Sequence, residues 1–73
     1  MDAERLVAMA NDIANFFDSE PDAQAAVEGV RFHISRYWEA RMRREIRAHL
    51  ASGGAGLSPT ARAAVALLAG PDS

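Results

Sequence analysis

Four arginines, Arg36, Arg43, Arg44 and Arg47, fall within a stretch of twelve residues and are the most chemically distinctive feature of the sequence. A guanidinium group can donate two parallel hydrogen bonds to a carboxylate or a phosphate, and it stays charged at physiological pH. The stretch therefore predicts a surface that binds a partner, either an acidic protein or a phosphate group. The alternative is a solvated helix face, supported by pairs such as Glu39 with Arg43.

Residues that could catalyse a reaction or bind a metal are few. The chain has no cysteine, and its two histidines, His33 and His49, lie on different predicted helices. A metal site would need carboxylates from distant positions, and no zinc-protease, phosphate-loop or dinucleotide-binding motif is present. We expect both histidines to be structural. The sequence thus predicts no catalytic, cofactor-binding or metal-binding residues, and a protein that is not an enzyme by itself.

The hydrophobic spacing predicts an all-α fold, a small bundle of three to four short helices in a single domain over residues 1–73. Apolar residues recur at intervals of three and four, and no stretch alternates apolar with polar residues for long enough to form a strand. The helices are expected at approximately 2–18, 20–37, 39–52 and 58–69.

Capping signals set these expected boundaries. Ser19, with Asp22 three residues later, resembles a capping box, and Pro21 is tolerated in the first turn of a helix. The remaining signals are Asp2 as an N-cap, a bend at Trp38 and Glu39, a glycine-rich end to the third helix at residues 52–56, and Ser58 followed by Pro59 at the start of the fourth.

The apolar stripes of the predicted helices define the expected core. Tyr37 falls on the inward stripe of the second helix, and Gly29 within that helix indicates that another backbone packs close by. The residues predicted to form one core are Leu6, Met9, Ile13, Phe16, Val27, Val30, Ile34, Trp38, Met42, Ile46 and Leu50.

Charge is unevenly distributed along the 73 residues. Residues 1–30 contain seven acids and one arginine, whereas residues 31–73 contain seven arginines and three acids, and lysine is absent. The acidic first half disfavours nucleic acid as a partner, since nucleic-acid-binding domains are usually basic. No apolar run approaches the roughly 20 residues of a membrane span. The acidic amino terminus lacks the order of a secretory signal, so we expect a cytoplasmic protein without membrane contact. Self-association is left open.

Three blocks of residues match the pattern of a known family. They are Leu6-Val7-x-Met9-Ala10-Asn11-x-Ile13-x-x-Phe16-Phe17, then Val30-x-x-His33-Ile34-x-x-Tyr37-Trp38-Glu39-x-Arg41-Met42-Arg43, then Gly53-Gly54-x-Gly56-Leu57-Ser58-Pro59. Through them the chain resembles the delta subunit of NAD-dependent formate dehydrogenase, from about Leu6 to Leu68. The family commonly reads Trp-Asp-Pro-Arg-Met where this chain has Trp38-Glu39-Ala40-Arg41-Met42, which keeps an acidic cap and loses the proline.

The resemblance implies a non-catalytic accessory subunit of a cytoplasmic formate dehydrogenase that contains molybdenum or tungsten. It implies an alpha subunit carrying bis-molybdopterin guanine dinucleotide and iron–sulfur clusters, and beta and gamma subunits that pass electrons to flavin and NAD. No cofactor is expected in this chain. The implied partner is the alpha subunit with its complex, and the implied role is assembly, cofactor maturation or stabilisation.

Two other functions stay open at this point. One is a transient maturation chaperone that contacts the phosphates of the molybdopterin cofactor through its arginines. The other is a small helical nucleic-acid-binding protein that uses the third helix.

Overall fold

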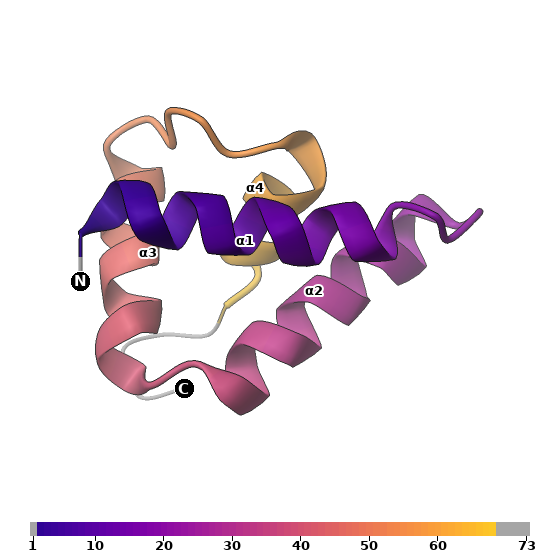
Figure 1. Cartoon of the computed structure of the whole chain (residues 1–73), viewed down its shortest axis with the longest axis horizontal. Coiled ribbons are helices and arrows are strands. Elements are labelled where there is room, and N and C mark those ends of the chain that lie inside the picture. The colour runs from indigo at the N-terminus through magenta and orange to yellow at the C-terminus, as the bar shows by residue number, and fades with distance from the viewer. Residues whose placement is uncertain (1, 69–73) are drawn as a thin grey trace.

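The computed structural model describes residues 2–68, which form four α-helices and no strand (Figure 1). The helices are α1 (Ala3–Phe17), α2 (Ala23–Tyr37), α3 (Ala40–Ala51) and α4 (Pro59–Ala66). The predicted all-α class is therefore confirmed, and each helix is somewhat shorter than expected. The last predicted residue of the fourth helix, at position 69, lies outside the described residues, as do the ends of the predicted domain.

Helices α1 and α4 lie at the centre of the arrangement. In Figure 1, α1 runs across the molecule in front of α4, with α3 and α2 on either side. α1 contacts all three other helices, and α4 also packs against α2 and α3. Each helix thereby covers its apolar stripe with at least two neighbours.

Two of the helices begin as their sequences predict. The Asp2 carboxylate accepts a hydrogen bond of 2.9 Å from the backbone N–H of Arg5. The Ser58 hydroxyl accepts one of 3.2 Å from the backbone N–H of Ala61, and Pro59 occupies the first position of α4. These caps satisfy N–H groups that have no partner within a helix.

The start of α2 differs from the prediction. Asp22, not Ser19, is the N-cap, and its carboxylate accepts a hydrogen bond of 3.0 Å from the N–H of Gln24. The Ser19 hydroxyl instead donates to the carbonyl of Phe16 at 3.2 Å. Because Asp22 provides the capping oxygen itself, α2 begins at Ala23, three residues later than the expected start at position 20.

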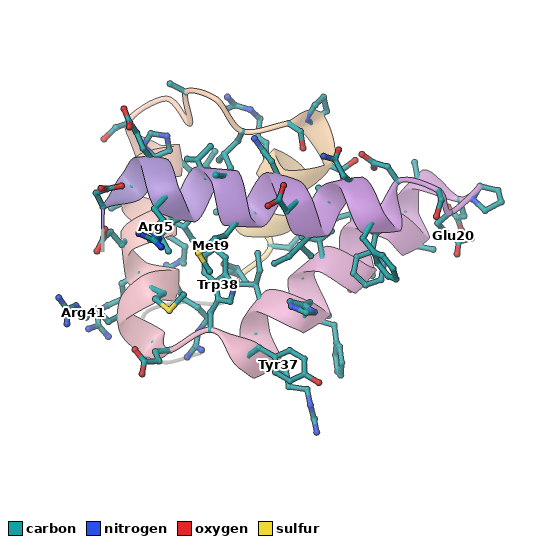
Figure 2. All side chains as sticks on the ribbon, in the orientation of Figure 1. Arg5, Met9, Glu20, Tyr37, Trp38 and Arg41 are labelled. Carbon is teal, nitrogen blue, oxygen red and sulfur yellow. The ribbon has the colours of Figure 1, made fainter. Side chains whose placement is uncertain are left out.

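The predicted bend between the second and third helices is confirmed. Trp38 and Glu39 are both extended, with ψ angles of 141° and 154°. The Trp38 side chain is only 5% exposed, and Figure 2 shows it turned in among the helices. The buried indole anchors the corner, so the missing proline of the family pattern does not remove the bend.

The core draws on all four helices and contains many small side chains. Ala10 and Ala14 of α1 and Ala61 and Ala64 of α4 are fully buried. Such small side chains let helix backbones approach closely. The larger buried residues are Leu6, Val7, Val30, Ile34, Trp38, Ile46, Leu57, Val65 and Leu68.

Two residues predicted to point inward lie at the surface. Phe16 is 75% exposed, so the prediction that places it in the core is wrong. Tyr37 is 66% exposed, so the prediction that places it on the inward stripe of the second helix is also wrong. Neighbouring helical residues point about 100° apart, and Phe17, not Phe16, takes the inward position of its pair. Trp38 likewise takes the buried position after Tyr37. The other predicted core residues are buried, or half-buried against the core: Met9, Ile13, Val27, Met42 and Leu50.

Gly29 meets an aromatic ring and not, as the sequence predicts, a backbone. A Cβ atom at this position would lie 2.5 Å from both Cδ1 and Cε1 of Phe17. The absent side chain therefore makes room for the Phe17 ring where the end of α1 meets α2.

Asn11 joins α1 to the connection between α3 and α4. Its amide Nδ2 donates to the carbonyl of Gly56 at 2.8 Å, and its Oδ1 accepts from the N–H of Ser58 at 2.9 Å. Gly53, Gly54 and Gly56 in this connection all have positive φ angles, as the predicted loop and cap role requires. One amide side chain thus fixes both the loop and the start of α4.

Candidate functional site

The bend at Trp38 divides the four predicted partner-binding arginines between two helices. Arg36 lies in the last turn of α2, whereas Arg43, Arg44 and Arg47 lie on α3. On α3 the three arginines occupy one side at spacings of one and three residues, next to the buried stripe that contains Ile46. Arg44 is exposed and Arg47 is half-buried.

Arg43 makes a contact within the fold, besides being a predicted partner-binding residue. Its guanidinium donates a hydrogen bond to the backbone carbonyl of Trp38. That carbonyl lies in the extended corner between α2 and α3, outside the regular bonding of either helix. Arg43 therefore helps to hold the corner, and of the four arginines it is the one whose loss is expected to affect the fold.

Arg36 lies among aromatic rings. Its guanidinium carbon is 6.0 Å from the centroid of the Phe32 ring and 5.8 Å from that of Tyr37. The Tyr37 ring in turn lies 4.8 Å from the imidazole of His33. Contacts at these distances attract a cation to the ring faces. They hold the charge of Arg36 at the surface of α2 beside two exposed rings.

The exposed aromatic side chains form a surface that sequence reasoning missed. Phe16, Phe32 and Tyr37 are 75%, 59% and 66% exposed, and Figure 2 shows Tyr37 pointing away from the bundle. Together with three half-buried neighbours on α1 and α2 and the exposed Arg36 they form what we call the aromatic face: Ile13, Phe16, Phe17, Phe32, His33, Arg36 and Tyr37.

An open hollow connects the two helices of the aromatic face. It has a volume of about 370 Å³ and is lined by Asp12, Ile13, Phe16, Phe17 and His33. The rings of Phe16 and Phe17 meet edge to face, with centroids 5.1 Å apart and planes at 89°. The hollow is therefore a largely apolar recess with aromatic walls, and Asp12 places one carboxylate in its lining. The doublet Phe16-Phe17 was the available signal, since both members of a helical pair cannot point inward.

The two histidines lie in different surroundings. His33 lines the hollow, whereas the Nε2 atom of His49 is 2.8 Å from the carbonyl oxygen of Ala55 in the glycine-rich connection. Arg62 donates to the carbonyls of Gly53 and Gly54 in the same connection, both at 3.0 Å. Within residues 2–68, no group of three or more histidine, aspartate or glutamate side chains could hold a metal ion.

A comparison with protein families finds a match over residues 5–65, from the first turn of α1 to the last turn of α4. The matching family is described as "NADH-dependant formate dehydrogenase delta subunit FdsD". The chain belongs to this family. The resemblance carried by the three sequence blocks is thereby confirmed, and membership of the delta-subunit family associates the chain with a formate dehydrogenase complex.

Comparisons with curated proteins and with solved structures found no match. In the part of the chain that the structure describes, no helix is both long enough and apolar enough to cross a membrane.

The residues that carry the family resemblance include several that build the fold. Asn11 of the first block bonds to Gly56 and Ser58 of the third. Arg43 of the second block bonds to the carbonyl of Trp38 in the same block. Much of the delta-subunit pattern thus has a structural explanation, whereas Phe16 and Tyr37 belong to the pattern and lie exposed.

Proposed function

We propose that the chain is a non-catalytic accessory subunit that binds the alpha subunit of an NAD-dependent formate dehydrogenase in the cytoplasm. The observation that carries this proposal is the family match over residues 5–65. By binding the molybdopterin-containing subunit, the chain would aid assembly of the complex, maturation of its cofactor or its stability. The bis-molybdopterin guanine dinucleotide, iron–sulfur clusters, flavin and NAD belong, in this proposal, to the partner subunits.

The arginines supply the charge for this association. Arg36, Arg43, Arg44 and Arg47 are the residues we propose as partner contacts, and Arg43 has the additional bond to Trp38. Exposed ion pairs contribute only about 0–1 kcal/mol each to the stability of a free chain. Charge-assisted hydrogen bonds to a carboxylate or phosphate of the partner are stronger and more specific, which supports a role for the cluster in binding.

The proposal is tested by co-expressing the tagged chain with the alpha, beta or gamma subunit one at a time. We expect the alpha subunit to be retained and the beta and gamma subunits to be lost on washing. Retention of beta or gamma without alpha would contradict the proposed partner.

A second experiment tests the accessory role. The complex is purified from cells with and without the chain, and its molybdenum or tungsten content, subunit composition and formate oxidation are compared. We expect lower metal content or incomplete assembly without the chain. A complex of unchanged composition, metal content and activity would contradict the role.

Stoichiometry distinguishes a resident subunit from a transient chaperone. Native mass spectrometry of the purified active enzyme is expected to show one copy of the chain for each alpha subunit. A chain present only in alpha subunit that lacks its cofactor would instead identify a chaperone that leaves after maturation.

A further inference from the structure

We infer that the aromatic face is the surface on which this chain docks, and that its occupant is an apolar segment of the alpha subunit bearing a carboxylate that pairs with Arg36. The inference rests on the proposed function and extends it by assigning the surface and the chemistry of the segment that covers it.

The first observation is the exposure of three large aromatic side chains that the fold does not use. The core is complete with Leu6, Val30, Ile34 and Ile46 fully buried, whereas Phe16, Phe32 and Tyr37 remain mostly exposed on α1 and α2. Contiguous apolar surface of this kind is uncommon on free soluble proteins and marks sites of association. Aromatic side chains are also enriched in protein interfaces, and tyrosine is among the residues that contribute most of the binding energy there.

The second observation is the shape of the surface. The hollow of about 370 Å³ between α1 and α2 has Ile13, Phe16 and Phe17 on its apolar sides. An aliphatic side chain such as leucine or methionine fits a recess of this kind and would bury the exposed rings around it. Phe17 is half-buried and packs against Gly29, so this wall of the hollow needs little ordering when a partner binds.

The third observation is the charge at the edge of the rings. Among residues 2–68, no carboxylate lies within ion-pair distance of Arg36. Its guanidinium is held beside Phe32 and Tyr37, so its orientation is restricted before a partner arrives. A carboxylate on the docking segment would accept two hydrogen bonds from this group, and the surrounding rings would exclude water from the pair.

Charge also favours a different protein over a second copy of this chain. Between residues 6 and 30 the sequence has five acids and no basic residue, and this stretch supplies one side of the aromatic face. Two copies meeting through that face would bring two acidic segments together, which like-charge repulsion disfavours. We therefore assign the face to a different protein, the alpha subunit of the proposed function.

The test measures retention of variants by tagged alpha subunit. The face variant combines Phe16→Gln with Tyr37→Gln, because glutamine is a good helix former and both positions are largely exposed. Its control is Leu67→Gln, which alters an exposed apolar residue outside the face. We expect retention of the face variant to fall by at least about tenfold, and that of the control to match the parent.

A matched pair of charge reversals tests the carboxylate. Arg36→Glu and Arg41→Glu both change an exposed arginine, but Arg41 points away from the bundle on α3, far from Tyr37 in Figure 2. We expect Arg36→Glu to weaken retention by about tenfold and Arg41→Glu to leave it unchanged. Parent-like circular dichroism of each variant shows that the fold is preserved.

A photoreactive phenylalanine analogue at position 16 provides a readout that does not depend on loss of binding. We expect it to cross-link to the alpha subunit, and we expect no cross-link from the same analogue at position 67.

Normal retention of both the face variant and the Arg36→Glu variant, or absence of the cross-link at position 16, would overturn the inference and leave the proposed function standing. Failure of the parent chain to bind alpha at all would refute the proposed function itself. A parent dimer that the face variant abolishes, with alpha binding intact, would show that the face pairs two copies and would also overturn the inference.

Discussion

The ring of Phe17 occupies the space that a side chain at Gly29 would fill. A Cβ atom there would lie 2.5 Å from two of the ring carbons, so the end of α1 can meet α2 at this distance only because position 29 is glycine. The contact turns Phe17 inward and leaves its neighbour Phe16 facing solvent.

This relationship predicts an unusual effect of Gly29→Ala. Alanine in place of a helical glycine normally stabilises by about 1 kcal/mol, but here the clash with Phe17 should cost about 1–3 kcal/mol, which cancels or exceeds that gain. In a Phe17→Ala background the same change should become stabilising. Chemical denaturation of the four proteins in this double-mutant cycle measures the coupling. Equal effects in both backgrounds would mean that the ring does not constrain position 29.

Asn11→Ala should destabilise the fold by about 1–3 kcal/mol, because it removes two hydrogen bonds and leaves the N–H of Ser58 without its acceptor. Asn15→Ala is the matched control, since Asn15 lies exposed on the same helix. Thermal unfolding compares the two. We expect Asn11→Ala to lower the melting temperature and Asn15→Ala to leave it unchanged. Equal melting temperatures for the two variants would show that the hydrogen bonds of Asn11 contribute nothing to stability.

Truncation to alanine should lower the stability of the fold strongly at Trp38 and hardly at all at Phe16. Trp38→Ala removes a side chain that is 5% exposed and should cost about 3–5 kcal/mol, a large part of the stability of a small domain. Phe16→Ala, at 75% exposed, should change the free energy of unfolding by less than about 0.5 kcal/mol. Urea denaturation followed by circular dichroism checks both values. A large loss for Phe16→Ala would place that ring in the core.

Charge reversal on α3 should affect association through salt-dependent attraction. Arg44→Glu with Arg47→Glu avoids Arg43 and its bond to Trp38, so the fold should persist. We expect weaker binding to the alpha subunit, by no more than about fivefold for each exposed pair, and a smaller effect of added salt than in the parent. Binding measured at two salt concentrations tests this, and parental affinity and salt dependence would show that these two arginines are merely solvated.

Local signals in the sequence predict most of the fold. The caps at Asp2 and Ser58 and the bend at Trp38 depend on neighbouring residues, and each was predictable from its residue types. The choice between Phe16 and Phe17 was not, because it depends on Gly29 in another helix. Periodicity locates an apolar stripe only to within one neighbouring residue. It also does not reveal which helices pack together, such as α3 against α1 and α4.

The candidate site was harder to predict than the fold. The arginines stand out by type, but the bend separates Arg36 from the three on α3. Phe32 and Tyr37 lie beside Arg36 on α2, but Phe16 and the hollow join them only when α1 and α2 are packed together. A pattern that assigns every large apolar residue to the core overlooks such a surface.

The alanines buried between the helices affect the entropy of folding. Ala10, Ala14, Ala61 and Ala64 are completely buried, and an alanine has no side-chain rotamers to lose when it is ordered. A core of leucines at these positions would bury more apolar area but would also restrict more side-chain motion. This chain instead orders part of its interior at the cost of backbone freedom alone, which favours folding in a protein with so few residues to contribute.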